Sequence, residues 1–259
     1  MIDRTVAIEL TKGKSWHHDF EIIPGVRTHG AYNPEGLWHE LQLPADMRGI
    51  SLADVGACNG YFSFEARKRG AHVVAFDIRH KDNSGFGLAQ HINGLADIEH
   101  HQINILDVRL NEHGPFDIVL ALGLLYHTPD PYRALANCAA LSRERLVVEA
   151  YCIDELLSGG PAPEPVMRFI PDATRFPGQG QPNADRSNFW GFSATCLQRM
   201  VEDVGFAVRR TNVRSERVLM DAWRLVSDPA VMRLNLGYGV RPRIPVGGNL
   251  DEPNAWTMF

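Results

Sequence analysis

The stretch DVGACNGYF, residues 54–62, joins the end of an apolar run to a glycine turn and the start of a helical pattern. The run GISLADVG (49–56) predicts a buried strand, and NGYFSFEARKRG (59–70) has helical spacing ahead of a basic last turn and Gly70. A strand that leads through glycines into a helix presents free backbone N–H groups and a positive helix end to a ligand. This turn is therefore the first predicted ligand site.

The turn opens a regular alternation of predicted strands and helices. Further strands are predicted over 71–78, 98–108, 116–123, 144–152, 206–213 and 217–226, and further helices over 131–142 and 193–206. Strands that alternate with helices indicate a parallel sheet with helices on both faces. The first 48 residues are expected to be irregular, because prolines and glycines punctuate them.

One long segment interrupts this alternation. Residues 155–190 contain six prolines and four glycines, which is too long and too broken for a simple connection and suggests a lid or docking insertion. We expect an N-terminal cap over 1–48, a main domain over 49–228 that contains this insertion, and an extended tail over 229–259.

Composition and charge set loose bounds on the class of protein. The chain has 259 residues and a net charge of -5, which argues against a surface built as a whole to hold nucleic acid. Its four cysteines form no CxxC pair, so neither a zinc site nor a disulfide framework is indicated. No apolar run approaches the roughly 18 residues of a membrane span or the length of a signal peptide. We expect a cytoplasmic protein.

The spacing of the glycines indicates which ligand the turn suits. A dinucleotide site needs G-x-G-x-x-G, whereas three other residues separate Gly56 from Gly60, and no Lys-Ser/Thr pair of a P-loop follows. Asp54 would attract a cationic ligand, and Asp77, at the end of the second strand, can accept hydrogen bonds from both hydroxyls of a ribose. A ligand with a cationic end and a ribose fits both, and S-adenosylmethionine is such a ligand.

Two longer stretches carry a family resemblance. LADVGACNGYFSFEARKRGAHVVAFDI (52–78) resembles the first two motifs of the class I S-adenosylmethionine-dependent methyltransferases. FDIVLALGLLYHTPDPYRAL (116–135) more particularly resembles the tRNA wobble-uridine carboxymethyltransferase and its methyltransferase-like relatives, and WHHDFEIIPGVRTHGAYN (16–33) fits the same group. The resemblance covers roughly residues 16–226. It implies an α/β fold with a seven-stranded, mostly parallel sheet whose last strand is antiparallel.

The resemblance also implies a cofactor site, residue by residue. It places Asp54, Gly56 and Gly60 around the methionine part of S-adenosylmethionine, with Ala57 and Asn59 of the same turn in the cofactor set. It places Asp77 and Ile78 at the ribose, Asn104, Ile105 and Leu106 at the adenine, and Leu122 and Tyr126 beside the cofactor beyond the fourth strand. Asn104 stands where many relatives carry Asp, and its amide oxygen still accepts a hydrogen bond.

This chain departs from the carboxymethyltransferase at the cations that hold the extra carboxylate of its modified cofactor. His18 stands at the position of one lysine, Leu37 near a second lysine, and Leu219 or Met220 near an arginine, so only Tyr126 is retained. Charge-assisted hydrogen bonds contribute about 1.5 to 3 kcal/mol each. We therefore predict plain S-adenosylmethionine and transfer of a methyl group.

Methyl transfer to a hydroxyl requires alignment and removal of a proton. His127, directly after the fourth strand, is the first candidate base, while the alternative is a structural histidine that bonds the backbone of the proline-rich turn. The other candidates for catalysis are His29 and Tyr151, and those for substrate binding are Trp16, His18, Arg168 and Trp190. No metal is predicted, because the spacing of the histidines supports no shared ion.

The favoured function is methylation of a small molecule, most simply at a hydroxyl of a natural product or sugar. One alternative is a tRNA wobble-uridine methyl or carboxymethyl transferase, for which the arginine-rich stretch 205–243 would hold phosphates. Another is a protein that binds the cofactor without chemistry, as a sensor or partner subunit. A nicotinamide oxidoreductase is disfavoured by the missing middle glycine. The sequence indicates no membrane partner and no particular oligomeric state.

Overall fold

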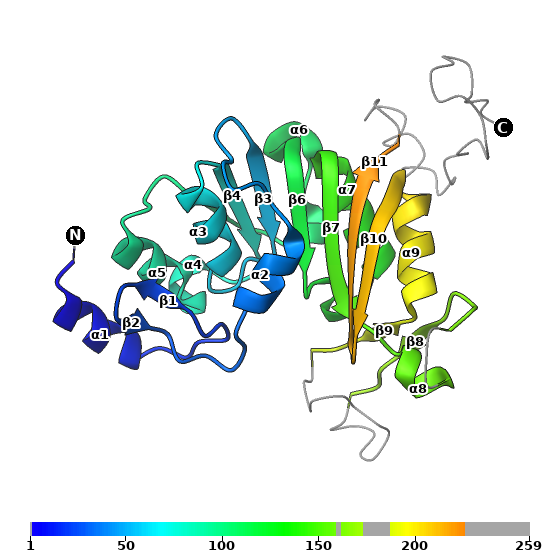
Figure 1. Ribbon diagram of the computed structural model, residues 1–259, viewed down its shortest axis with the longest axis horizontal. Coiled ribbons are helices and arrows are strands. Elements are labelled where there is room, and N and C mark those ends of the chain that lie inside the picture. The colour runs from blue at the N-terminus through cyan, green and yellow to red at the C-terminus, as the bar shows by residue number, and fades with distance from the viewer. Residues whose placement is uncertain (1, 159–161, 173–186, 226–259) are drawn as a thin grey trace. The chain divides into compact units, whose positions relative to one another are not determined.

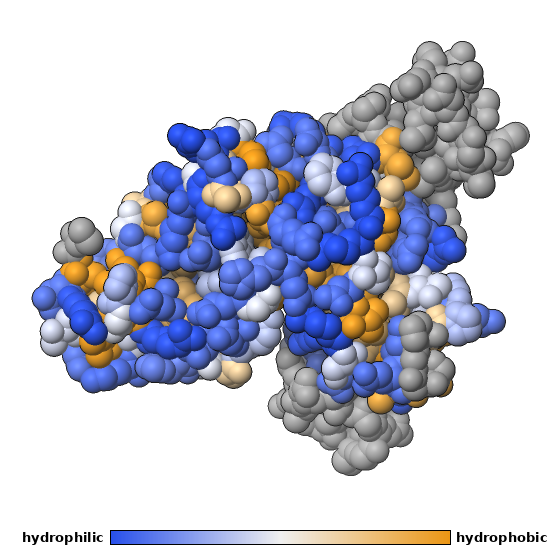
Figure 2. Space-filling model, viewed as in Figure 1, coloured by the Kyte–Doolittle hydropathy of each residue, from blue (hydrophilic) through white to orange (hydrophobic). Residues whose placement is uncertain are grey.

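The computed structural model describes residues 2–158, 162–172 and 187–225 (Figure 1). The predicted tail over 229–259 and parts of the predicted insertion over 155–190 lie outside these residues. Among the described helices, none has the length and apolar character that a membrane crossing requires. Most of the face in Figure 2 is hydrophilic, with apolar side chains in small groups.

The described chain is built from short helices and strands. The strands are β1 (Glu21–Ile23), β2 (Val26–Arg27), β3 (Ser51–Val55), β4 (His72–Asp77), β5 (Glu99–Gln102), β6 (Phe116–Leu122), β7 (Ser142–Tyr151), β8 (Met167–Phe169), β9 (Trp190–Phe192), β10 (Phe206–Arg214) and β11 (Arg217–Arg224). The α-helices are α1 (Arg4–Lys12), α2 (Glu35–Leu41), α3 (Tyr61–Lys68), α4 (Lys81–Ser84), α5 (Phe86–Asn93), α6 (Leu110–His113), α7 (Pro131–Leu141), α8 (Asp154–Ser158) and α9 (Ala194–Asp203). Two 3-10 turns, η1 (Ile105–Asp107) and η2 (Leu125–His127), complete the set.

The main sheet has seven strands in the order β10-β11-β7-β6-β3-β4-β5 (Figure 1). The pairs β3–β4 and β4–β5 are parallel, whereas β11, the last strand, runs antiparallel to both β10 and β7. This arrangement confirms the predicted fold class, an α/β fold with a mostly parallel seven-stranded sheet and an antiparallel last strand.

The chain divides into two compact units. Unit 1 comprises the described residues up to Val108 together with 116–120, and unit 2 comprises 109–115 together with the described residues from Ala121 onward. In unit 1, α3 follows β3 and buries Phe62, Phe64 and other residues, as its predicted spacing requires. Parallel pairing brings the carboxyl ends of β3, β4 and β5 to the same edge, which is where open α/β sheets bind ligands.

The prediction of an irregular N-terminal segment is wrong. Residues 4–41 contain α1, the β1–β2 hairpin and α2, and the punctuating prolines and glycines fall between or at the ends of these short elements. The Asp3 side chain caps α1 by accepting hydrogen bonds from Thr5 N and Val6 N at 2.9 and 3.2 Å. Elements this short carry little periodicity, which is why the sequence pattern did not reveal them.

The third predicted strand is also shorter than expected. Strand pairing ends at Gln102, and the chain then enters η1, whose N-cap Asn104 accepts a hydrogen bond from Leu106 N at 3.0 Å. An asparagine side chain that bonds the backbone two residues on turns the chain away from a sheet. The predicted strand over 98–108 is therefore a four-residue strand followed by a turn.

Unit 2 contains the antiparallel part of the sheet. In its interior the Arg145 guanidinium makes two hydrogen bonds with the Asp221 carboxylate, at 2.8 and 3.0 Å, and joins β7 to β11. Ser193, the first residue of the predicted helix 193–206, is the N-cap of α9, and its hydroxyl accepts a hydrogen bond from Cys196 N at 3.1 Å. Its C-cap is Val204, and Gly205 follows with a left-handed φ of 92°.

Candidate functional site

The glycine turn, residues 56–60, connects β3 to α3. Gly60 has a left-handed φ of 88°, and Cys58 before it has a φ of 53°. A Cβ atom on Gly60 would lie 2.6 Å from ring atoms of both Phe64 and Phe86. Backbone conformation and close packing therefore both require glycine at this position.

The backbone N–H groups of this turn are largely used inside unit 1. Gly56 N and Ala57 N donate to Phe76 O at 2.8 and 3.2 Å, and Cys58 N donates to Asp77 Oδ2 at 2.8 Å. The prediction that the turn presents free N–H groups is therefore wrong for these three residues. They bind the end of β4, which disfavours a phosphate as the ligand of this turn.

Asp77 is the last residue of β4 and is only 7% exposed. Its Oδ2 accepts the hydrogen bond from Cys58 N, and its Oδ1 accepts one from Arg79 N at 2.8 Å. A carboxylate offers about four acceptor positions, so these backbone bonds fix its orientation and leave acceptor capacity. The Arg79 guanidinium, with Nε 3.5 Å from Oδ1, was not singled out by the sequence, because its place depends on how the chain turns after β4.

Asp54 is buried beneath the start of α3. Its Oδ2 accepts hydrogen bonds from Ser63 N at 3.1 Å and from the Ser63 hydroxyl at 2.7 Å. Burial raises the pKa of the Asp54 carboxyl to about 6, against the lowering effect of these bonds. The carboxylate thus anchors the helix that follows the glycine turn, and an electrostatic attraction toward a cationic ligand stays a prediction.

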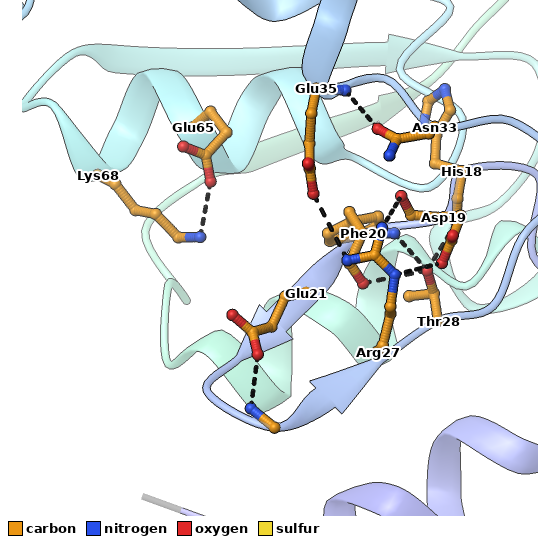
Figure 3. A network of polar contacts seen from close by, with 11 residues as sticks. His18, Asp19, Phe20, Glu21, Arg27, Thr28, Asn33, Glu35, Glu65 and Lys68 are labelled. Atoms are coloured by element: carbon orange, nitrogen blue, oxygen red, sulfur yellow. Dashed lines mark hydrogen bonds and ion pairs between the residues drawn. The ribbon is translucent and has the colours of Figure 1, made fainter.

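Asn59 ties the N-terminal segment to the glycine turn. Its Oδ1 accepts hydrogen bonds from His17 N and His18 N at 2.8 and 2.9 Å, and its amide donates to Ser84 O. The Thr28 hydroxyl holds the same segment from the other side, where it donates to His18 O at 2.7 Å (Figure 3). A predicted cofactor residue therefore also positions the backbone at His18.

His18 is 6% exposed and packs its ring against the edges of Tyr61 and Phe62, at centroid distances of 6.5 and 5.8 Å. Among the described residues, no group forms a hydrogen bond with its Nδ1 atom. Burial, with the charges of His17 and Arg79, lowers the pKa of His18 to about 3. The imidazole is therefore neutral near pH 7 and keeps one buried nitrogen without a protein partner.

The predicted adenine and ribose residues lie along the neighbouring strand ends of unit 1. Ile78, directly after Asp77, is 64% exposed. Asn104 uses its side-chain oxygen to cap η1, and Ile105 is buried with 5% exposure. Roles of these residues toward an adenine stay predictions.

Two other predicted residues of unit 1 have separate surroundings. Trp16 is 8% exposed, donates its indole N–H to Thr11 O at 3.0 Å and packs over Gly85, so it belongs to the core. His29 is exposed and has a left-handed φ of 54°. Their predicted roles in substrate binding and catalysis stay predictions.

In unit 2, Tyr126 contacts an arginine and, through it, a buried acid. Arg217 Nη1 donates to the Tyr126 hydroxyl at 2.5 Å, and its guanidinium carbon lies 5.0 Å from the centroid of the tyrosine ring. Arg217 Nε lies 3.5 Å from Glu149 Oε1, and Glu149 is 7% exposed. Burial raises the pKa of the Glu149 carboxyl, against the lowering effect of the Arg217 charge. The family resemblance placed an arginine near Leu219 or Met220, so Arg217, two residues before Leu219, was not predicted.

The backbone around Tyr126 is held by neighbouring chain segments of unit 2. Leu122, half-buried, ends β6, and Gly123 after it has a left-handed φ of 67° and donates its N–H to Glu149 O at 3.0 Å. Phe189 N donates to Tyr126 O at 2.7 Å. The η2 turn is thus fixed between β7 and the segment that precedes β9.

His127 is half-buried, and its Nδ1 lies 2.9 Å from the Ser187 hydroxyl oxygen and 3.3 Å from Ser187 O. Both proposed roles for this histidine stay predictions, and its ring contacts the backbone and the side chain of Ser187. Trp190 donates its indole N–H to Pro129 O at 3.3 Å, so it braces that turn. Trp190 therefore contacts the turn that directly follows His127.

Tyr151 and Arg168 are the remaining predicted residues of unit 2. Tyr151 ends β7 with 4% exposure, and its ring lies 6.4 Å from the ring of Tyr126. Burial raises the pKa of its hydroxyl, an effect that the charge of Arg168 partly offsets. Arg168 itself is exposed in the middle of β8.

Across residues 2–158, 162–172 and 187–225, no three His, Cys, Asp or Glu side chains gather in a way that could hold an ion. The paired histidines of β5 instead contact aromatic rings, His100 packing on Phe86 at 4.8 Å and His101 on Phe76 at 5.4 Å between ring centroids.

Comparison with known proteins identifies relatives of the chain. The sequence profile of the methyltransferase domain family matches residues 34–211. A ubiquinone biosynthesis O-methyltransferase of Neisseria meningitidis is 27% identical over 203 residues, which cover 76% of this chain and 79% of that protein. A tRNA U34 carboxymethyltransferase of Desulfotalea psychrophila is 30% identical over 128 residues, which cover 46% of this chain and only 38% of that protein.

Solved structures share the fold. The N-terminal domain of EvdMO1 with S-adenosylhomocysteine bound superposes with a TM-score of 0.60 at 18% identity, covering 86% of this chain and 97% of that chain. Magnesium protoporphyrin IX methyltransferase of Synechocystis with S-adenosylmethionine bound gives a TM-score of 0.51 at 18% identity, covering 73% and 77% of the two chains. At this identity the likeness concerns the fold.

Proposed function

The chain belongs to the methyltransferase domain family, and we propose that it transfers a methyl group from S-adenosylmethionine to a hydroxyl of a small molecule. The observation that carries this proposal is the Asp77 carboxylate. It stands at the carboxyl end of a parallel strand, beside a glycine turn, with its orientation fixed by two backbone N–H groups. A carboxylate held in this way suits the two hydroxyls of a ribose.

The residues of unit 1 fit this cofactor better than they fit a phosphate-bearing one. The N–H groups of Gly56, Ala57 and Cys58 are already bonded, so they are not available to a pyrophosphate. S-adenosylmethionine contains no phosphate, so it requires no N–H groups for a pyrophosphate. Asp77 would hold its ribose, and Ile78 would cover an apolar face of the nucleoside. Among the described residues, the Nδ1 atom of His18 has no hydrogen-bond partner, and the Asn59 side chain holds the His18 backbone at the glycine turn.

When bound, S-adenosylmethionine supplies a methyl carbon that its sulfonium already activates toward a nucleophile. The chain's own residues then have to position an acceptor and receive its proton. His127 is suited to hold that proton, because an imidazole titrates near neutral pH and this one is half-buried, with Ser187 at its Nδ1. Ser187 would fix the orientation of the ring.

Two observations support methyl transfer to a small acceptor over the reaction of the tRNA carboxymethyltransferase. His18, which replaces a lysine of the carboxymethyltransferase, is neutral near pH 7, because burial lowers its pKa to about 3, so it offers no charge to a cofactor carboxylate. The O-methyltransferase relative from Neisseria is matched over most of its length, whereas the tRNA enzyme from Desulfotalea is matched over 38%. The relatives' names apply to those proteins, and for this chain they support only the class of acceptor.

One observation favours the second candidate, a tRNA wobble-uridine modifier. Arg217 on the last strand bonds the Tyr126 hydroxyl, so the chain retains one cation and one tyrosine of the kind that hold the extra carboxylate. Calorimetric titration with S-adenosylmethionine and with carboxy-S-adenosylmethionine separates the candidates. We expect plain S-adenosylmethionine to bind more tightly, and a preference for the carboxylated cofactor would favour the tRNA enzyme.

The proposal as a whole is tested by ligand identity. We expect the protein to bind S-adenosylhomocysteine in calorimetry and to show no heat with NAD, and any nucleoside that co-purifies to have the mass of S-adenosylmethionine or its demethylated product. Binding of NAD without binding of S-adenosylhomocysteine would overturn the proposal. Binding of the cofactor without methyl transfer to any hydroxyl compound in a broad panel would favour a non-catalytic role instead.

A further inference from the structure

Tyr151 occupies an unusual position in unit 2. It is the last residue of β7, at the sheet edge where strands of this fold end toward ligands, and it is 4% exposed. Among the described residues, none forms a hydrogen bond with its hydroxyl oxygen. Buried hydroxyls are normally paired, since leaving one unpaired destabilises the fold, so an unpaired one at a ligand-binding edge calls for an explanation.

The surroundings of Tyr151 are shaped to receive its ring. Gly191 of β9 faces it, and a Cβ there would lie 3.1 Å from two ring atoms of Tyr151 and 2.4 Å from Ile153 Cγ2. A larger residue at Gly191 would clash with Ile153 and press on the tyrosine ring. Arg168, paired with Gly191 across the β8–β9 ladder, is close enough to act electrostatically on the Tyr151 hydroxyl.

A second unpaired polar atom lies on a neighbouring segment. Asn188 Oδ1 is buried and, within the part of the chain that the structure describes, has no hydrogen-bond partner. The next residue, Phe189, donates its N–H to Tyr126 O at 2.7 Å, and the Tyr126 ring lies 6.4 Å from the Tyr151 ring. An unpaired hydroxyl and an unpaired amide oxygen therefore both lie on segments that contact Tyr126.

We propose that Tyr151 and Asn188 bind the methyl acceptor, and that they select an acceptor that carries hydroxyl groups. The phenol O–H donates and the amide oxygen accepts, and a hydroxyl group satisfies both, because it is itself an acceptor and a donor. A carboxylate or phosphate satisfies only the phenol. This inference rests on the proposed function and gives Tyr151 a binding role in place of the general-base role first considered, since burial keeps its hydroxyl protonated.

The first test uses the protein without any acceptor. Tyr151→Phe removes a hydroxyl that has no partner, so the melting temperature should stay unchanged or rise. Tyr132→Phe is the matched control, because the Tyr132 hydroxyl donates to Asp203 Oδ2 at 2.7 Å, and its loss should lower the melting temperature by about 2 to 4 °C. An equal drop in both variants would overturn the proposal, because Tyr151 would then be a structural hydrogen-bonding residue.

The second test uses defined probes on the protein saturated with S-adenosylhomocysteine. Catechol and methyl α-D-glucopyranoside carry neighbouring hydroxyls, and 1,2-dimethoxybenzene and benzoate are the matched compounds that lack them. We expect at least one hydroxyl probe to bind at millimolar concentration, and Tyr151→Phe and Asn188→Ala each to weaken it about tenfold. Tyr132→Phe should leave probe binding unchanged.

The affinity of Tyr151→Phe for S-adenosylhomocysteine should equal that of the unmodified protein. If neither hydroxyl probe binds, or if both variants bind the probes normally, the acceptor subsite is wrong while the proposed function stands. If S-adenosylhomocysteine itself does not bind the unmodified protein, the proposed function fails first.

Discussion

A single carboxylate, Asp77, carries the proposed cofactor recognition, and its removal is the most direct test at the residue scale. Asp77→Asn should weaken the binding of S-adenosylhomocysteine by roughly 10- to 100-fold, because charge-assisted hydrogen bonds contribute about 1.5 to 3 kcal/mol. Asp97→Asn is the control, since it removes a carboxylate that is exposed to solvent and paired with Arg67. Calorimetry measures both, and equal affinities would contradict a ribose-binding role for Asp77.

Two buried groups of unit 1 should give the stability of the protein opposing pH dependences. The pKa of His18 is lowered from 6.5 to about 3, so the unfolded chain binds more protons, and stability is lost as the pH falls from about 6.5. The pKa of Asp54 is raised from 3.8 to about 6, so the folded chain binds more protons, and stability is gained as the pH falls from about 6 toward 4.

Substitution of each group should reveal the effect of the other. We expect His18→Gln to lose less stability than the unmodified protein between pH 6.5 and 5, and Asp54→Asn to lose more between pH 6 and 4.5, by at most about 1.4 kcal/mol per pH unit. Urea unfolding at several pH values measures this. The lowered pKa of His100 affects the pH dependence of stability in the same direction as that of His18, and the raised pKa of Glu149 in the same direction as that of Asp54. The informative quantity is therefore the difference in this pH dependence between each variant and the unmodified protein. Parallel profiles for all three proteins would contradict the prediction.

At the scale of one element, both close packing and a left-handed backbone conformation require glycine at residue 60 of the glycine turn. Gly60→Ala should destabilise the protein by about 1 to 3 kcal/mol, because its φ is 88° and the new Cβ would meet the Phe64 and Phe86 rings at 2.6 Å. Gly36→Ala in α2 is the matched substitution, since nothing lies within 4 Å of its Cβ position. It should be neutral or stabilise by up to about 1 kcal/mol. Urea unfolding compares the two, and an equal effect would show that the turn tolerates a side chain.

For the whole molecule, charge argues against a nucleic-acid substrate. A net charge of -5 repels phosphates unless a local basic surface overcomes it. We expect no retention of tRNA at about 150 mM salt, and weak, strongly salt-dependent retention at most at about 50 mM. Gel-shift titration over this range checks the expectation, and tight binding at the higher salt would restore the tRNA enzyme as the leading candidate.

Several features of this protein follow from the sequence alone. The alternation of apolar runs with helical spacing predicts the mostly parallel sheet, because burial dictates side-chain periodicity in each element. The glycine spacing excludes a dinucleotide fingerprint, and the position of Asp77 after the second strand indicates a ribose. The motif around Tyr126 and His127 indicates the methyltransferase relatives. Each of these depends on residues close together in the chain.

Other features depend on the tertiary structure. Arg217 lies 91 residues after Tyr126, and only the pairing of β11 with β7 brings its guanidinium to the tyrosine hydroxyl. The short elements before residue 48 were missed because packing, and not periodicity, stabilises them. The neutrality of His18 arises from burial, and so does the Tyr151 hydroxyl that has no hydrogen-bond partner among the described residues. The sequence by itself determined the seven strands of the main sheet and the cofactor class, because these are local patterns. The partners and protonation of the buried side chains were decided by the fold, because desolvation and hydrogen bonding depend on neighbours in space.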